Sequence, residues 1–126
     1  MTLDGTDSYL RTNTRLPDPT ADFTALAWVR LDETGDEPSV VWSLPGREHP
    51  DVELFHSRRL DRWVLGRSDI GQENSRPTGA RARAPVSRTT NTWVHLVGTH
   101  DAARGELSLY VDGRPTPPGT PCPVPF

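Results

Sequence analysis

The clearest alternation of hydrophobic and polar positions lies in residues 93–113, WVHLVGTHDAARGELSLYVDG. Residues 93–100 are rich in β-branched and aromatic side chains, and residues 106–112 alternate apolar and polar positions. Alternation with a period of two is typical of a β-strand that buries one face. The polar connection at 101–105 contains a glycine and has the length of a hairpin loop. The pattern predicts a β-hairpin whose second strand points these side chains inward: Leu107, Leu109 and Val111.

Shorter apolar stretches, separated by polar or proline-containing turns, predict further strands. These are residues 2–5 and 7–12 as a short hairpin, then 23–31, 39–44, 51–56, 60–66 and 80–86. Both faces of residues 23–31 carry apolar side chains, which favours an interior position in a sheet over an edge. Residues 68–79 lack apolar periodicity and predict a surface loop. Many short strands joined by turns predict an all-β fold.

Three segments carry a resemblance to a known family. They are Leu3-Asp4-Gly5 with Ser8-Tyr9-Leu10, then residues 23–30 (FTALAWVR), and then the W-x-H-L-V-G and L-x-L-Y-V-D-G patterns of residues 93–113. In this order they resemble the laminin-G-like (concanavalin A-like) jelly-roll family, particularly its bacterial secreted branch. The resemblance covers roughly residues 2–114. It implies an antiparallel two-sheet jelly-roll sandwich over residues 1–113 and an extracellular location.

The C-terminal segment, residues 114–126, holds six prolines. Prolines remove ladder donors and fix φ, so the segment predicts a disordered or polyproline-like tail without strands. In the resembled family about three further strands follow the V-D-G pattern. We therefore expect a C-terminally truncated, incomplete jelly roll with an open sheet edge near residues 23–31 or 8–12. Open edges and partly exposed apolar side chains favour self-association.

Composition limits the classes of partner and site. The net charge is -3, with 14 arginines interspersed among 17 acidic residues, which does not form the basic patch of a nucleic-acid-binding protein. A single cysteine, Cys122, excludes an internal disulfide and a cysteine-based metal site. No apolar run approaches transmembrane length, and no signal peptide precedes the first strand. If the domain is extracellular, we expect it to be a module of a longer secreted protein.

A glucanase activity would require a specific set of carboxylates on one strand. Glucanases of the resembled fold carry an E-x-D-x-x-E strand motif, in which an acid and a nucleophile lie about 5–5.5 Å apart. The nearest match is Asp51-Val52-Glu53, which lacks the third carboxylate. We interpret this pair as a solvated strand face and predict no catalytic residues. A glycosidase-like domain with an incomplete site and a structural spacer domain of a surface protein stay open as alternatives.

The candidate metal ligands in this chain are histidines and aspartates. His95 and His100 lie five residues apart on one strand and so on opposite faces, where they cannot bind one ion. We interpret His95 as structural, with a hydrogen-bonded ring. Laminin-G-like domains often hold Ca²⁺ at a loop rim, and the resemblance makes Asp4 and Asp101 the candidates. The alternative is that these carboxylates cap their own turns, as Asp112 does before Gly113.

Aromatic residues are the candidates for ligand binding, because sugars stack on exposed rings. Trp28, Trp42 and Trp93 lie in apolar strands, which predicts core positions. Trp63 lies among arginines and is the tryptophan least committed to the core, although an interior position is equally open. The predicted ligand-binding residues are therefore Trp63, Arg62 and Arg67. Taken together, the sequence predicts a non-catalytic carbohydrate- or protein-binding module whose partner is a glycan or an extracellular protein.

Overall fold

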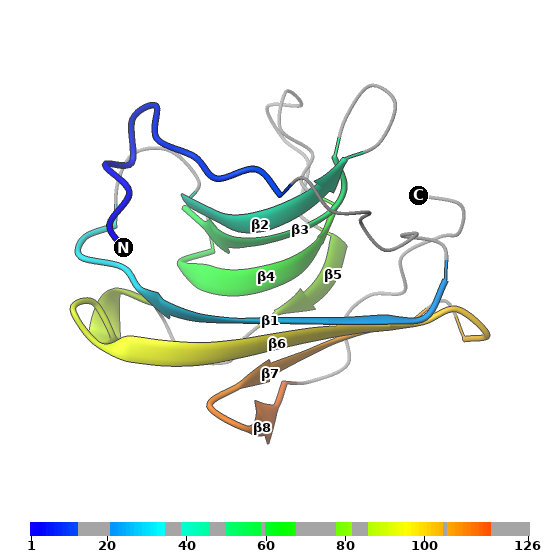
Figure 1. Cartoon of the computed structure of the whole chain (residues 1–126). Coiled ribbons are helices and arrows are strands. Elements are labelled where there is room, and N and C mark those ends of the chain that lie inside the picture. The colour runs from blue at the N-terminus through cyan, green and yellow to red at the C-terminus, as the bar shows by residue number, and fades with distance from the viewer. Residues whose placement is uncertain are drawn as a thin grey trace.

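The computed structural model describes residues 1–12, 21–34, 39–45, 50–58, 60–67, 78–81, 86–104 and 106–116. These residues form two antiparallel four-stranded sheets, which lie one above the other (Figure 1). The elements are β1 (Phe23–Arg30), β2 (Ser39–Pro45), β3 (Pro50–Ser57), β4 (Arg62–Arg67), β5 (Thr78–Arg81), the 3₁₀ turn η1 (Val86–Arg88), β6 (Trp93–Asp101), β7 (Glu106–Val111) and β8 (Arg114–Pro115). The predicted all-β, two-sheet architecture is confirmed. Within the described ranges, no helix is long and apolar enough to cross a membrane.

The first sheet has the strand order β1-β6-β7-β8. β1 pairs with β6 without interruption, from Phe23 opposite His100 to Arg30 opposite Trp93. The predicted β6–β7 hairpin is present. β7 and β8 are joined by Asp112 and Gly113, whose φ angles of 50° and 78° are those of a type I′ hairpin turn. The prediction that Asp112 is a turn residue is therefore confirmed.

The second sheet has the order β2-β3-β4-β5. The predicted strands at residues 51–56 and 60–66 are present as β3 and β4, and they pair as a hairpin. β2 pairs with β3 and contains register shifts at Val40/Trp42 and at Leu44/Pro45. Because β4 lies between β3 and β5, its backbone is paired on both sides.

The core lies between the two sheets and follows the alternation of the strands. Its buried members come from both sheets: Phe23, Leu44, Val52, Leu54, Trp63, Leu65, Val86, Val94, Leu96, Leu107 and Leu109. The inward face predicted for β7 is therefore correct. Gly98 faces the second sheet so closely that a Cβ on it would lie 2.8 Å from Leu65 Cδ2. The sheets are in direct contact at this point.

Four expectations are corrected. Residues 1–12 form no strand, because Asp4 closes this segment into a turn. In the described first sheet β1 has β6 as its single neighbour, so it is an edge strand rather than an interior one. Glu53, expected on a solvated face, is buried. β8 begins at residue 114, past the predicted domain end, since proline is tolerated on an edge strand. Most of the predicted 68–79 loop, and residues 117–126, lie outside the described residues.

Candidate ligand-binding face

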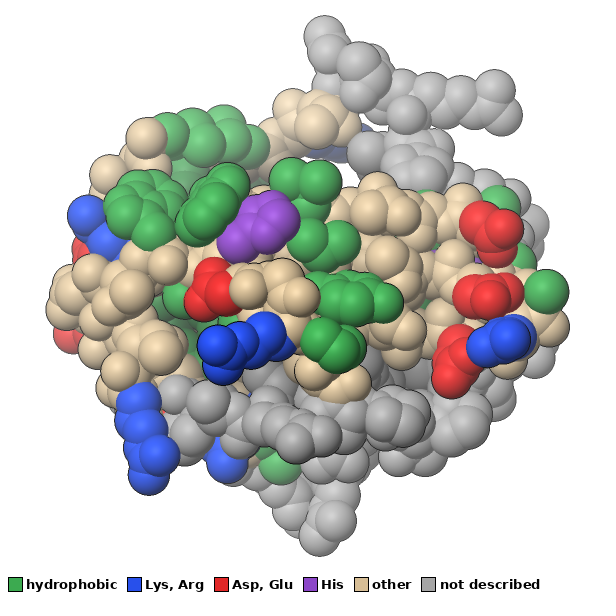
Figure 2. All heavy atoms as spheres, turned by 90° about the horizontal axis from the view of Figure 1, so that it is seen from below, with side chains coloured by type: hydrophobic (Ala, Val, Ile, Leu, Met, Phe, Trp, Pro, Cys, Tyr) green, Lys and Arg blue, Asp and Glu red, His purple; other side chains and the backbone are tan. Residues whose placement is uncertain are grey.

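The outward face of the first sheet carries large apolar and aromatic side chains. Leu26 and Trp28 on β1 are 62% and 63% exposed, and Trp93 on β6 is 55% exposed. The register places Leu26 opposite Val97, Trp28 opposite His95 and Arg30 opposite Trp93. Figure 2 views this sheet from outside and shows hydrophobic side chains gathered around a histidine. We call this surface the outer aromatic face: Leu26, Trp28, Arg30, Trp93, His95, Val97 and Tyr110, which lies opposite Val97 on β7.

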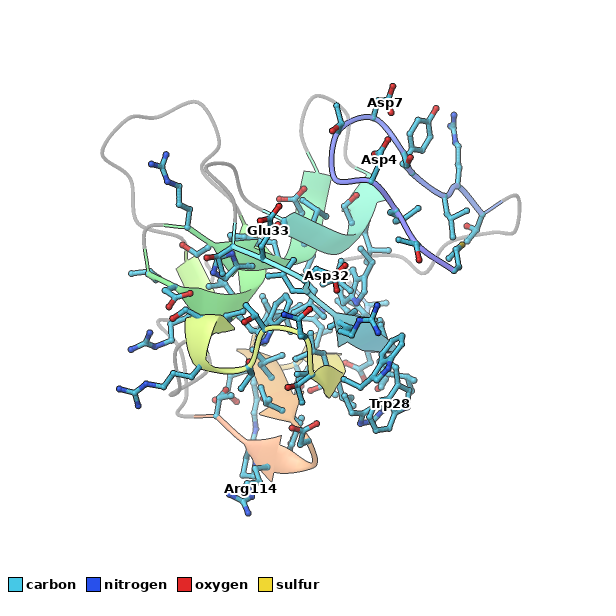
Figure 3. All side chains as sticks on the ribbon, turned by 90° about the vertical axis from the view of Figure 1, so that its left-hand side faces the viewer. Asp4, Asp7, Trp28, Asp32, Glu33 and Arg114 are labelled. Carbon is cyan, nitrogen blue, oxygen red and sulfur yellow. The ribbon has the colours of Figure 1, made fainter. Side chains whose placement is uncertain are left out.

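Contacts within the outer aromatic face orient its rings. The His95 ring lies against the Trp28 ring, with centroids 4.8 Å apart and an interplanar angle of 40°. The guanidinium carbon of Arg30 lies 5.6 Å from the centroid of the Trp93 ring, within the range of a cation–π contact. Arg30 Nε also donates to Asp32 Oδ1 at 3.1 Å. Each indole is thus held by a polar neighbour, while much of its surface stays open to solvent; Trp28 projects away from the sheet (Figure 3).

These positions correct the prediction that Trp28 and Trp93 belong to the core. The inward parity of β1 is Phe23, Ala25, Ala27 and Val29, and Trp28 has the other parity. The sequence did hold a signal for this outcome. Thr24 and Arg30 share the parity of Trp28 in β1, and polar residues on a strand's parity indicate its solvent-facing side.

Trp63, the predicted binding tryptophan, is 4% exposed and belongs to the core. Its ring meets the buried His56 ring edge-on, with centroids 6.1 Å apart and an interplanar angle of 74°. The prediction is wrong because both parities of β4 are buried: Val64 on the opposite face is also inaccessible. Trp63 therefore cannot act as an exposed platform.

Arg62 forms no exposed site with Trp63, which is buried. Arg62 Nη1 donates to the carbonyl oxygens of Leu60 at 3.1 Å and Asp61 at 3.0 Å, so its guanidinium stabilises the β3–β4 turn. Arg67 is the last residue of β4, and its side chain lies outside the described part of the structure. Arg62 is not a member of the outer aromatic face.

The predicted calcium ligands each cap a turn of their own. Asp4 Oδ1 accepts the backbone N–H groups of Thr6, Asp7 and Ser8 at 2.9, 3.2 and 3.1 Å. These bonds stabilise the charged carboxylate and lower the pKa of Asp4 far below its ordinary value. Figure 3 shows Asp4 and Asp7 on the same N-terminal loop.

Asp101 behaves in the same way, since its Oδ1 accepts the backbone N–H of Arg104 at 3.2 Å. In the ranges that the structure describes, no group of three or more His, Cys, Asp or Glu side chains is placed to hold a metal ion. Asp4 and Asp101 are thus not brought into a common calcium site there, and the turn-capping alternative describes both. His95 and His100 do lie on opposite faces, as predicted, with His100 buried.

A polar cluster that the sequence did not predict joins the β3–β4 turn to η1. His56 Nε2, which is buried, lies 2.9 Å from Asp61 Oδ1, and Ser87 Oγ donates to Asp61 Oδ2 at 2.5 Å. Burial raises the pKa of Asp61, but the hydrogen bonds from Ser87 and His56 outweigh it and leave the pKa below its ordinary value. In a hydrolase triad the histidine lies between hydroxyl and carboxylate. Here the carboxylate lies between the other two, an order that suits a structural link and not activation of Ser87.

Comparison with known proteins agrees with this architecture. Residues 4–121 match the model of the concanavalin A-like lectin/glucanases superfamily, in its Laminin_G_3 family. The chain belongs to this superfamily. It is also similar to the pentraxin-related protein PTX3 of Bos taurus, with 30% identity over 92 residues, which is 72% of this chain. The chain spans about a fifth (21%) of the length of that relative. No solved structure matches it significantly.

Membership of the concanavalin A-like superfamily accounts for the two antiparallel sheets but not for a site. The superfamily match runs past residue 113, where we expected the domain to end, and it includes β8. Within the described part of this concanavalin A-like domain, the outer aromatic face is where large aromatic side chains are most exposed on a strand. It is the candidate site on which the functional proposal rests.

Proposed function

We propose that this concanavalin A-like domain is a non-catalytic, extracellular binding module that recognises carbohydrate through its outer aromatic face. The observation that carries the proposal is the exposure of Trp28 and Trp93, at 63% and 55%, on diagonal positions of two paired strands. An indole in solvent on a regular strand forgoes the burial that stabilises a core tryptophan. Ligand binding is the function that compensates for this loss.

The chemistry of this face suits a sugar. Pyranose rings present C–H groups that pack on an indole, while their hydroxyls need hydrogen-bonding partners beside it. His95 next to Trp28 and Arg30 next to Trp93 provide such partners. The face also includes Leu26 and Val97, which would suit an apolar protein surface. A protein ligand is therefore the alternative outcome of the test.

Two observations support a non-catalytic role. Glu53, the glutamate nearest to a glucanase motif, is buried, whereas a glycosidase places two carboxylates beside its substrate. The Asp61 cluster has its carboxylate between His56 and Ser87, and the serine hydroxyl donates a hydrogen bond to the carboxylate. A glycosidase-like domain with an incomplete site and a structural spacer stay as the competing functions.

A glycan array probed with the purified chain tests the proposal, followed by titration of the best glycan against three proteins. We expect the wild type and Tyr9→Ala to bind equally, since Tyr9 is exposed on the N-terminal segment and is not part of the face. Trp28→Ala should bind at least about tenfold more weakly, which corresponds to loss of about 1.4 kcal/mol of binding free energy. Wild-type affinity in Trp28→Ala would reject this face as the site. Absence of any glycan ligand would favour the spacer or a protein-binding role.

A further inference from the structure

The free edge of β1 is the second unexplained surface. In the described sheet, β1 pairs with β6 on one side and with no strand on the other. The carbonyl oxygen of Leu31 accepts the N–H of Asn91, just before β6, at 2.9 Å, and the carbonyl oxygen of Ala21 lies 2.8 Å from His100 Nδ1 on β6. Odd-numbered residues therefore direct their backbone groups toward β6. Since backbone groups alternate sides along a strand, the even-numbered residues from 22 to 30 direct theirs to the open edge.

We infer that this edge pairs with β1 of a second copy of the chain, in an antiparallel, two-fold symmetric arrangement. Pairing must match even-numbered residues with even-numbered ones, because these carry the available donors and acceptors. The register that we propose places Leu26 opposite Leu26 of the partner subunit, and Arg30 opposite Asp22 of the partner subunit. Trp28 then lies opposite Thr24 of the partner subunit. Two-fold symmetry makes every pair occur twice, except the central one.

Charge selects this register from its neighbours. A shift of two residues in one direction would place Asp22 opposite Asp32 of the partner subunit, and like charges directly opposite one another are destabilising. The same shift in the other direction would place Trp28 opposite Asp22 of the partner subunit and move Arg30 past it, so that no acidic residue would lie opposite Arg30. The proposed register alone gives two Arg30–Asp22 pairs.

The end of β1 that would receive the partner's Arg30 carries Asp22, whose Oδ1 accepts the N–H of Ala102 at 2.7 Å, which leaves Oδ2 as the acceptor for the guanidinium. A shallow depression there is lined by Asp22, Phe23, Thr24, Thr99, His100 and Asp101, which include two carboxylates. The Arg30 side chain is 44% exposed, and its partner Asp32 is more exposed still. An exposed pair of this kind is weak, so the guanidinium can turn to a new carboxylate at little cost.

Dimerisation through β1 would join two four-stranded sheets into one continuous sheet. Edge pairing leaves the side chains of both outer aromatic faces pointing to solvent. In the proposed register Trp28 of each copy would lie near the two-fold axis, and the two faces would form one continuous surface. It would also pair the free edge, an exposed feature that otherwise favours uncontrolled aggregation. The inference is independent of the carbohydrate proposal and holds if that proposal fails.

Sedimentation velocity of the full chain over a wide concentration range tests the dimer. We expect a reversible monomer–dimer equilibrium in the wild type. Arg30→Asp and Asp22→Arg should each raise the dimer dissociation constant at least tenfold, because each places like charges opposite one another. The double variant, with both charges reversed, should recover most of the wild-type affinity. Urea melts of each variant confirm folding, and if Asp22→Arg unfolds, Arg30→Asp and the crosslinking below decide.

Crosslinking tests the place of contact. In a Cys122→Ser background, Leu26→Cys should give covalent dimers with a short bis-maleimide, since the two introduced thiols face each other across the axis. Ser108→Cys is the matched control: it lies on the same face of the sheet, but on β7, two strands from the edge. It should give no covalent dimer. A chain that is monomeric at every concentration, a dimer indifferent to Arg30→Asp, or equal crosslinking of the two variants would overturn the inference.

Discussion

Two strands of this domain each carry a tryptophan close to an arginine, but one tryptophan side chain is buried and the other is exposed. In β4, Trp63 follows Arg62 and is 4% exposed; in β1, Trp28 precedes Arg30 by two residues and is 63% exposed. β4 is an interior strand of its sheet, and both of its faces are buried, whereas β1 is an edge strand of the sheet that the described residues form and has one face in solvent. Alternation along a strand thus identifies the residues that share a face. It does not identify which face the rest of the protein covers.

The largest expected effect is a difference in unfolding free energy between the alanine variants of the two tryptophans. Trp63→Ala should lower the free energy of unfolding by about 3–5 kcal/mol, because it removes a large side chain from the core and leaves a cavity. Trp28→Ala should change it by less than about 0.5 kcal/mol, the usual range for surface substitutions. Equilibrium urea unfolding of both variants measures the difference. Equal losses in the two variants would contradict the assignment of the faces.

The same comparison can be made within β7, where faces alternate residue by residue. Leu109 is buried and Ser108 lies on the outer side. Leu109→Ala should cost about 2–4 kcal/mol by lost transfer energy and cavity formation. Ser108→Ala should cost far less. If Leu109→Ala lost under half a kilocalorie in urea melts, the inward face would be assigned to the wrong residues.

A smaller effect is expected where the two sheets approach most closely. A methyl group on Gly98 would lie 2.8 Å and 3.0 Å from the two Leu65 methyl carbons and 3.4 Å from Trp42 Cζ2. Leu65 is fully buried and has little room to move, so Gly98→Ala should cost about 1–3 kcal/mol by overpacking. In combination with Leu65→Val, much of this cost should disappear. A double-mutant cycle from thermal or urea melts measures that coupling, and strict additivity would place the sheets further apart than we describe.

The smallest effect is a dependence of stability on pH. Hydrogen bonds hold the pKa of Asp4 and of Asp61 below their ordinary values in the folded state. A carboxyl with a lowered folded-state pKa adds stability that is complete above its unfolded pKa, about 3.9, and is lost as the pH falls through the folded pKa. The free energy of unfolding should therefore fall below about pH 4. Asp61→Asn and Asp4→Asn should each make that fall shallower, and an unchanged acid slope would show that neither carboxylate contributes.

The sequence predicted the strands better than their surroundings. Residues 23–30, 93–101 and 106–111 were found because alternation and turn residues are local properties of the chain. An open sheet edge near residues 23–31 was one expectation and an interior position for the same strand was another, because strand order depends on pairing between distant segments. Apolar side chains on both faces of residues 23–31 were interpreted as a sign of burial on both sides. They arise instead from one core face and one exposed aromatic face.

The prediction of an exposed Trp63 failed for a related reason. Arginines beside Trp63 were interpreted as a sign of exposure, but Arg62 bonds to turn carbonyls while Trp63 points into the core. The link between Asp61 and Ser87 spans 26 residues and has no local pattern. A carboxylate before a glycine, as at Asp4, is consistent with a metal ligand and with a turn cap alike. Hydrogen-bond geometry was needed to find the turn cap.

The proposed binding face depends most on which tryptophans face solvent, and one spectrum can measure this directly. The four indole N–H signals of the ¹⁵N-labelled chain can be assigned with single Trp→Phe variants and then recorded with a soluble gadolinium chelate. We expect strong relaxation of the Trp28 and Trp93 signals and little change in the Trp63 signal. Strong relaxation of Trp63, with Trp28 protected, would contradict the outer aromatic face and the binding function proposed for it.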